Sequence, residues 1–407
     1  MVKPEIQAAS RYRFVMYALL VSGNVVLGIA FLGPAVLLPQ IIDDYRIPSA
    51  SAGFYASSLT LMITVCSIPA GLMGPRFGLR VTVGIALLLM ASSILVPLIP
   101  GFLPLVLMRL LQGMGAGIFL PLQASVLMRW APPREFASMN AVTVAAATVG
   151  DGSSLIFGSY LIGLLGWEMV LAIETIPALI AAVCWMLLAR EGPGRGQEDR
   201  DVHPIPILDT LRLRTTWLLA LAVAGPWALF SGMSAWLPTY FSEVRGLDLA
   251  VAAANAAIFS LIGIPASFAG AAVTNRLGRR RPILLGAGIS VGAAAILTLY
   301  VPNGAFLMLA AALTGFLLVV YLPALFSVPM EMDNPTPHGA GAITGVIVMA
   351  GNGTSFLAPI IVGAIRDLTG GFQLGLGLMA VSSLSLVFAT LLLPETGPAR
   401  ALRQRAQ

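Results

Sequence analysis

Twelve apolar runs occupy most of this 407-residue sequence, and each is long enough to cross a bilayer as a helix, which takes ~20 residues. The apolar residues in each run are continuous and do not alternate with polar ones, which favours helices over a β-barrel. The sequence therefore predicts an all-α polytopic membrane protein. The predicted spans cover residues 14–38, 52–74, 81–99, 102–124, 137–162, 168–189, 215–241, 250–274, 282–301, 304–327, 339–365 and 372–393.

Charged residues make up only 10% of the chain, whereas a soluble domain has ~25%. The sequence predicts no soluble domain on which a basic patch could lie. The net charge of +5 therefore does not indicate a nucleic-acid partner. The two cysteines and two histidines are too few and too scattered for a disulfide framework or a metal cluster. We therefore expect no cofactor, no metal site and no enzyme activity.

The basic residues predict the orientation in the membrane. The run at 14–38 is too long for the apolar part of a signal peptide, so we interpret it as a retained first span. An even number of spans places both termini on one side. Loops on that side hold 19 of the 23 basic residues, the opposite loops hold three, and Arg109 lies inside a span. The positive-inside rule then predicts a multi-pass protein of the plasma (inner) membrane with both termini in the cytoplasm.

The second half of the chain repeats the first. Residues 190–214 are the long polar stretch of the sequence, which predicts a six-helix bundle at 1–190, a cytoplasmic central loop at 191–214 and a second bundle at 215–407. Four motifs recur at offsets between 199 and 202 residues, so we expect two parallel six-helix repeats related by an axis along the membrane normal. The pairs are FLGPAVLLP (31–39) with FSGMSAWLP (230–238), PRFGLR (75–80) with NRLGRR (275–280), GMGAGIFLP (113–121) with GFLLVVYLP (315–323), and VGDGSS (149–154) with AGNGTS (350–355).

Some of these motifs also resemble those of a known family. The loops GLMGPRFGLR (71–80) and AAVTNRLGRR (271–280) resemble the Gly-x-x-x-Asp-Arg-x-Gly-Arg-Arg signature of the major facilitator superfamily, and RLLQGMGAG (109–117) resembles its Arg-x-x-x-Gly-x-Gly motif. The resemblance covers the whole chain. It implies a secondary transporter whose two halves surround a central cavity and open it alternately to each side of the membrane.

The resemblance also implies a cytoplasmic gate. Arginines of the two signature loops can bind the helix C-termini of the opposite half and hold the cytoplasmic side closed. The signature aspartate is Pro75 in the first copy and Asn275 in the second, which weakens such a latch. The matching arginines are Arg76, Arg80, Arg276 and Arg280.

Three ionisable side chains fall well inside predicted spans: Arg109, Asp151 and Glu174. A charge at mid-membrane costs ~2.5–3.5 kcal/mol or more, so such residues face a cavity or pair with each other. At 1.5 Å per residue, Arg109 and Glu174 are both ~10 Å below the outer surface. One interpretation is therefore a structural ion pair. The other places Arg109 in the central cavity, where it meets a substrate carboxylate or a protonation site.

Asp151 lies at ~16 Å depth, in the first copy of the repeated Gly-x-Gly frame. Its counterpart in the second copy is Asn352, which hydrogen-bonds but does not titrate. Asp151 is thus a candidate proton-coupling residue, with a purely packing role beside Gly150 and Gly152 as the alternative. The contrast assigns charge chemistry to the first half and neutral recognition to the second.

Neutral polar or aromatic residues inside spans are further cavity candidates, each with helix–helix hydrogen bonding as the alternative role. Two of them, Trp227 and Ser231, lie on one face of their span together with Ser234, because their spacing is i, i+4, i+7. The candidates are Asn24, Gln112, Trp227, Ser231, Tyr321 and Asn352.

We expect a proton-coupled transporter of a small organic solute, with a monovalent organic anion as the favoured class. A single cavity arginine argues against a phosphate ester, which needs a more basic clamp. One alternative is proton-driven efflux of amphipathic compounds, although Gly158 stands where drug exporters of the family have a proline. A membrane-embedded sensor or enzyme is the alternative from another class. The expected partners are the solute, protons and the lipid bilayer, and we expect a monomer.

Overall fold

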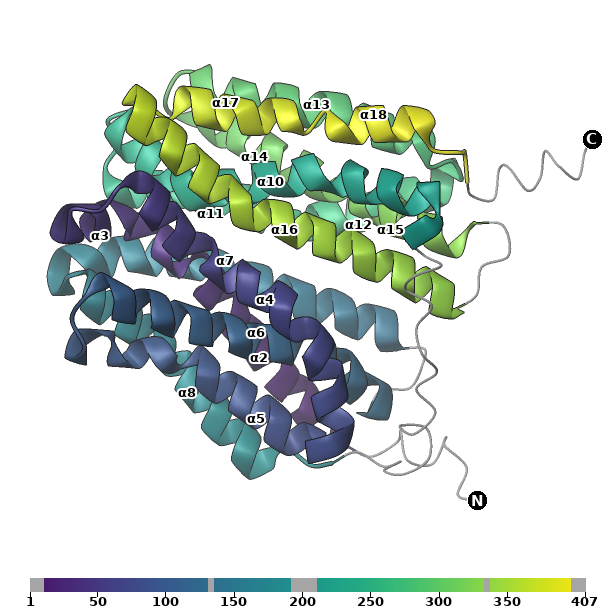
Figure 1. Ribbon diagram of the computed structural model, residues 1–407, viewed down its shortest axis with the longest axis horizontal. Coiled ribbons are helices and arrows are strands. Elements are labelled where there is room, and N and C mark those ends of the chain that lie inside the picture. Colours follow the sequence, from purple (N-terminus) through teal and green to yellow (C-terminus); the bar gives the residue numbers. More distant parts are fainter. Residues whose placement is uncertain (1–10, 131–134, 192–210, 333–336, 397–407) are drawn as a thin grey trace, which may run out of the picture. The chain divides into compact units, whose positions relative to one another are not determined.

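The computed structural model describes residues 11–130, 135–191, 211–332 and 337–396 (Figure 1). These residues form helices and connecting turns, and none of them lies in a β-strand. Twelve segments among them are long and apolar enough to cross a membrane, judged by length and composition. The predicted fold class, an all-α polytopic membrane protein with twelve spans, is therefore confirmed.

The chain divides into two compact units, one formed by residues 1–47 and 58–203 and the other by residues 48–57 and 204–407. The predicted loop between the halves falls mostly at residues 192–210, outside the described residues, so its limits remain a prediction. Large apolar side chains such as Leu164 and Leu368 are exposed on the units, as contact with lipid requires.

The helices of the first half are α2 (Arg13–Leu32), η1 (Gly33–Val36), α3 (Leu38–Tyr45), α4 (Ser49–Phe77), α5 (Leu79–Met90), η2 (Ser92–Leu98), α6 (Phe102–Trp130), α7 (Phe136–Leu165) and α8 (Trp167–Leu188). Those of the second half are α10 (Arg214–Glu243), α11 (Leu249–Leu261), α12 (Gly263–Leu277), α13 (Arg281–Tyr300), α14 (Ala305–Val320), α15 (Leu322–Ser327), η4 (Val328–Met330), α16 (Pro337–Thr369), α17 (Gln373–Ser382) and α18 (Ser385–Leu392).

Several spans that the sequence predicts as continuous helices are broken, and prolines explain three of the breaks. A proline has no N–H for the carbonyl four residues earlier, and its ring crowds that carbonyl. Pro34 follows the end of α2, Pro265 follows the end of α11, and Pro323 follows the end of α14. The first span therefore does not run as one α-helix to residue 38; it passes through the 3-10 helix η1.

The glycines of RLLQGMGAG pack helices closely together. A side chain at Gly113 or Gly117 would meet the backbone of α4 at Leu59 or Met62. A side chain at Gly115 would meet the carbonyl of Ala86 on α5. These glycines let α6 lie close to helices on two sides, and this packing fixes the position of the residues one and two turns before them.

The repeated Gly-x-Gly frame lies at equivalent helix crossings in the two halves. In the first half α2 packs on α7, where Gly28 faces Gly150 across a close backbone contact. In the second half α10 runs beside α16 (Figure 1), and the ring of Trp227 covers Gly351. The frame therefore recurs because each copy supplies a small residue at the contact between the first and fifth spans of its half.

Candidate functional site

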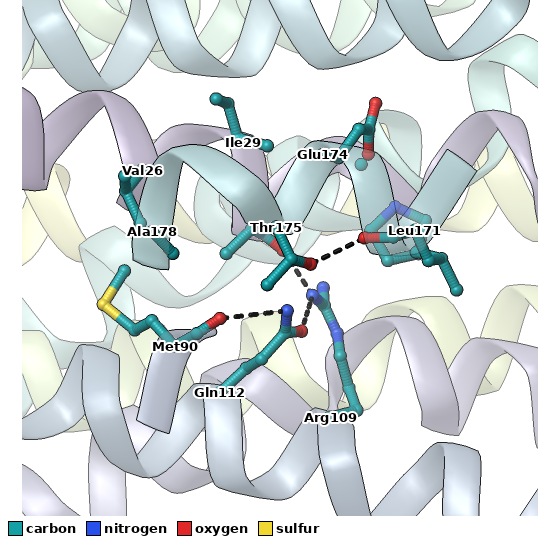
Figure 2. Close-up of a pocket in the computed structure, with 12 residues that line it drawn as sticks. Val26, Ile29, Met90, Arg109, Gln112, Leu171, Glu174, Thr175 and Ala178 are labelled. Atoms are coloured by element: carbon teal, nitrogen blue, oxygen red, sulfur yellow. Dashed lines mark hydrogen bonds between the residues drawn. The ribbon is translucent and has the colours of Figure 1, made fainter. Parts of the chain in front are cut away.

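A small cavity lies inside the first unit, enclosed by α2, η1, α5, α6 and α8. Figure 2 shows the residues that line it, which are apolar except for Arg109, Gln112, Glu174 and Thr175. Its free volume is about 10 Å³, close to the least that holds one water molecule. The structure thus brings Arg109 and Glu174, two of the three intramembrane charges singled out in the sequence, to one place.

Arg109 extends from α6 to the end of α2, and only 1% of it is exposed. Its Nη1 donates to the carbonyl of Ala30 and, at 3.1 Å, to Oε1 of Gln112. Its Nη2 donates to the carbonyl of Phe31 at 3.1 Å. Both carbonyls belong to the last turn of α2, where helical carbonyls lack backbone partners and a positive charge is favoured.

Pro34 explains why α2 presents those carbonyls. An N–H at position 34 would bond to the carbonyl of Ala30 in a continuous helix, and proline has none. The carbonyl of Ala30 is therefore available inside the bundle, and the Arg109 guanidinium takes it. A buried carbonyl left without a partner would cost ~1–3 kcal/mol, so the arginine stabilises the break in the first span.

Glu174 occupies a notch between two glycines. A side-chain carbon at Gly33 would collide with Oε2 of Glu174, and one at Gly158 would lie 3.0 Å from its Oε1. Oε1 is buried and has no hydrogen-bond partner among the residues that the structure describes. Arg109 lines the same cavity as this carboxylate. Gly158 thus makes room for Glu174.

Gln112 and Thr175 complete the polar lining of the cavity. Gln112 donates from Nε2 to the carbonyl of Met90 at 3.4 Å, besides accepting from Arg109. Thr175 donates to the carbonyl of Leu171, one turn earlier in α8, at 2.6 Å. Figure 2 shows these bonds around the guanidinium, so Gln112 links Arg109 to α5. The predicted candidate Gln112 therefore holds the arginine in place.

Asp151 is not among the residues that line this cavity. It is half-buried on α7, beside the crossing of Gly28 and Gly150, and its carbonyl accepts from the Ser154 hydroxyl at 2.9 Å. Its role in proton coupling remains a prediction.

Asn24 is buried at a different level of α2. Its Nδ2 donates to the carbonyl of Leu20 at 2.8 Å and to Oε1 of Gln123, on α6, at 2.9 Å. Gln123 was missed by sequence reasoning, although its position 11 residues after Gln112 places it on the same face of α6 three turns later. Asn24 and Gln123 therefore connect α2 to α6 by a hydrogen bond within the bundle.

In the second unit, Ser231 and Trp227 are bound to α16. The Ser231 hydroxyl donates to the carbonyl of Ser355 at 2.7 Å, and the Ser355 hydroxyl donates to the carbonyl of Trp227 at 3.2 Å. These bonds are the helix–helix alternative that the sequence left open for Ser231. Asn352 is half-buried on α16, one residue after the glycine that Trp227 covers.

Tyr321 lies at the break between α14 and α15 and is fully buried. Its hydroxyl has no hydrogen-bond partner in the part of the chain that the structure describes. The side chain packs in the apolar core of the second unit, against residues such as Leu219 and Leu325. A phenol buried in this way is available to a hydrogen-bonding group that enters its surroundings.

The second half has neutral residues at the positions equivalent to the charged cavity. By the offsets of the repeated motifs, Pro34 corresponds to Met233 and Arg109 to Ala311. Alignment of GlyTrp (166–167) with GlyPhe (371–372) pairs Glu174 with Met379, and Met379 faces Gly232 as Glu174 faces Gly33. The proline, the arginine and the glutamate of the first half are thus all replaced at the equivalent positions of the second half.

Two of the four signature-loop arginines, Arg80 and Arg280, bind within their own bundles. Arg80 donates from Nη2 to the carbonyl of Met186 at the end of α8, and its backbone N–H donates to Glu191 at 2.9 Å. Arg276 is exposed at the end of α12, and the side chain of Arg76 lies outside the described residues. A latch on the opposite half remains a prediction.

Arg280 is the buried member of the group, with 6% exposed. It forms an ion pair with Glu331, and its Nη1 donates to the carbonyl of Thr274 at 2.6 Å. Its backbone N–H donates to Glu395 at 2.7 Å, at the start of α13. Glu395 and Glu191 each follow the sixth span of their half, so both bundles secure the start of their third span in the same way.

Comparison with known proteins supports the fold and the family. The chain matches the family model "Major Facilitator Superfamily" over residues 19–359. It is 24% identical to the hexuronate transporter of Bacillus subtilis, covering 87% of this chain and 89% of that protein. It is 21% identical to the probable sulfoacetate transporter SauU of Cupriavidus necator, covering 89% and 90%.

Among solved structures, the chain is similar to a bacterial homologue of the human lysosomal transporter Spinster, crystallised in an inward-facing and unoccupied conformation. The TM-score is 0.80 at 17% sequence identity, over 94% of this chain and 96% of the other. A likeness at this level of identity concerns the fold. The family match establishes that this multi-pass membrane protein belongs to the Major Facilitator Superfamily of transporters.

Proposed function

We propose that this protein is a secondary transporter that moves a small organic anion across the plasma membrane by alternating access, coupled to protons. The observation that carries the proposal is the buried cation Arg109 inside a membrane-spanning bundle. A buried charge is expensive at this depth and has a functional role by default. A positive charge in a medium of low dielectric constant attracts an anionic solute.

The whole-length relatives support an acidic solute. One is named for hexuronate and the other for sulfoacetate, and both compounds carry a carboxylate. Each match spans nearly all of both chains, so it includes the two halves and not a shared fragment. We therefore propose a sugar acid or a small sulfonated carboxylate as the substrate class.

The two halves divide the work of recognition in this proposal. The first half supplies positive charge through Arg109, while the second half has Ala311 and Met379 at the equivalent positions and supplies hydrogen bonds. The candidates for contact with the neutral part of the solute are Trp227, Ser231, Tyr321 and Asn352. The unpartnered hydroxyl of Tyr321 supports its place in this group, because a hydroxylated solute can satisfy it.

Purified protein tests the substrate class directly. Thermal unfolding is measured with glucuronate, galacturonate, sulfoacetate, glucose and a cationic amphiphile, because a ligand that binds the folded state raises the midpoint. Uptake into proteoliposomes then follows for each compound, with the lumen more alkaline than the outside. The proposal is supported if at least one acid stabilises the protein and accumulates with the pH gradient while glucose does neither. Stabilisation by glucose or the amphiphile alone contradicts it.

A further inference from the structure

We propose that Glu174 is the proton-binding residue of this transporter, and that it couples proton binding to anion binding through the charge of Arg109. The inference rests on the proposed function and specifies its coupling site. The geometry that supports it is the glycine notch around a carboxylate oxygen with no hydrogen-bond partner among the described residues, in the same cavity as a buried guanidinium.

The notch is shaped for a carboxyl group. Gly33 and Gly158 come from different elements, η1 and α7, and each borders one oxygen of Glu174. A methyl group at either position would crowd the carboxyl. The free space beside it is sufficient for about one water molecule, which can deliver a proton to Oε1. In this step an O–H bond of a hydronium ion breaks, an O–H bond forms on Oε1, the carboxylate becomes a neutral carboxylic acid, and a neutral water molecule remains.

Few charges surround this carboxyl group. Arg109 from α6 faces the same cavity. On α7, Asp151 lies seven residues before Gly158, two turns away, and Tyr160 is exposed. On its own helix, Glu168 lies in the first turn of α8, six residues earlier. The residues of α2, η1 and α5 that line the cavity are not ionisable. Arg109 is therefore the charged group that most affects whether Glu174 is protonated.

Charge balance then provides the coupling. With Glu174 ionised, its negative charge offsets that of Arg109, and the bundle interior is close to neutral. With Glu174 protonated, the positive charge of Arg109 remains, and in a medium of low dielectric constant it attracts an anion strongly. By reciprocity, a bound anion favours protonation of Glu174. The proton and the anion therefore load together and leave together, as symport requires.

The repeat offers a natural comparison. The second half lacks both charges, since its equivalents of Arg109 and Glu174 are Ala311 and Met379, and it also has Pro359 where the first half has Gly158. The arginine, the glutamate and the Gly158 side of the glycine notch are therefore all present in the first half and all replaced in the second. A structural ion pair alone would need no notch that keeps one carboxylate oxygen free of hydrogen bonds.

The test compares wild type, Glu174→Gln and Glu174→Met in proteoliposomes, using glucuronate or sulfoacetate, whichever wild type accumulates. Gln mimics the protonated acid, and Met is the residue of the second half, so one of the two substitutions should leave the protein folded. Glu168→Gln is the matched control, because it makes the same change on the same helix. Two fluxes are measured: accumulation driven by a pH gradient, and exchange of labelled for unlabelled anion at equal pH.

We expect Glu174→Gln and Glu174→Met to lose pH-driven accumulation and to keep exchange, because exchange between two loaded faces needs no proton release. Anion affinity of wild type should rise at least about fivefold from pH 8 to pH 6, the low end of typical coupling, and change less than twofold in either variant. Glu168→Gln should behave as wild type.

Retained pH-driven accumulation in a folded Glu174 variant overturns the proposal, and so does an equal loss of both fluxes. If Asp151→Asn abolishes accumulation while the Glu174 variants keep it, the coupling site is Asp151. Failure of the proposed function appears differently, because wild type itself would then accumulate no acid from the panel.

Discussion

Arg109 donates a hydrogen bond to the carbonyl of Ala30, the acceptor that Pro34 deprives of its helical partner. The proline and the arginine are 75 positions apart in the sequence and lie on different helices. The proline frees the carbonyl, and the arginine binds it. Without the break, α2 would have no carbonyl to offer, and without the arginine the break would leave a buried acceptor unsatisfied. The second half, with Met233 and Ala311, has neither.

This relationship predicts a coupling between two substitutions. Arg109→Ala alone should lower the free energy of unfolding by ~1–3 kcal/mol, because the carbonyls of Ala30 and Phe31 lose a buried donor. Pro34→Met restores an N–H for the Ala30 carbonyl, so the double variant should be more stable than the sum of the single changes by about 1 kcal/mol. Unfolding in detergent, followed for wild type and the three variants, measures this difference. Additive effects would show that the two residues act independently.

The glycine notch predicts a positional effect on α7. Gly158→Ala places a methyl group about 3.0 Å from Oε1 of Glu174, so the carboxyl group or its neighbours must shift. We expect pH-driven accumulation to slow by roughly two- to tenfold, equivalent to about 0.4–1.4 kcal/mol, with little loss of folded protein. Gly163→Ala is the control on the same helix, since nothing lies within 4 Å of a side chain there. Equal effects of the two substitutions would argue against a special role for the notch.

The buried ion pair of the second unit predicts a contrast between two nearby positions. Glu331→Ala removes the partner of Arg280, whose side chain is 7% exposed, and should lower the free energy of unfolding by ~1–3 kcal/mol. Arg276→Ala changes an exposed residue and should stay within ~0.5 kcal/mol. Thermal unfolding of both variants checks this. The opposite order would mean that Arg276, and not Arg280, holds the ends of these helices.

Arg276→Ala also tests the proposed latch by a separate readout. If the signature loops hold the cytoplasmic side closed, this substitution should increase labelling of single cysteines placed at the predicted cytoplasmic ends of the fourth and tenth spans, because the population of open protein rises. Labelling that stays at the wild-type level in folded protein would leave the arginines with a role inside their own bundles.

The distribution of basic residues predicts where reporters appear. Fusions after Gln407 and within residues 190–214 should report the cytoplasm, and a reporter inserted at 43–50 should report the outside. Reversed results at any two of the three sites would contradict the proposed orientation.

Much of the architecture could be predicted because the hydropathy of the sequence determines which segments span the membrane. Runs of ~20 apolar residues fixed the number of spans, and the recurring motifs located the repeat. The break in α2 was missed, although Pro34 is visible in the sequence, because apolar residues continue on both sides of it. The structure places Arg109 and Glu174, which have equal predicted depth, on the lining of one cavity, and the role of each remains a prediction.

Which side of each helix points into the bundle was harder to predict. A span that is apolar all round gives no signal for which side is buried. For this reason sequence reasoning left two positions open for Arg109, an ion pair with Glu174 and the central cavity, and it missed Gln123. Contacts with backbone atoms, such as those of Arg80 with Met186 and of Arg109 with Phe31, leave no trace in residue types at all.

The most direct test of the account measures protons and anion together. Proteoliposomes with wild-type protein hold a pH-sensitive dye, with equal pH on both sides, and receive glucuronate or sulfoacetate outside. We expect the lumen to turn acidic as the anion enters, with glucose causing no change and Glu174→Gln abolishing the acidification. Entry of the anion without any change in lumenal pH would contradict proton coupling and the role assigned to Glu174.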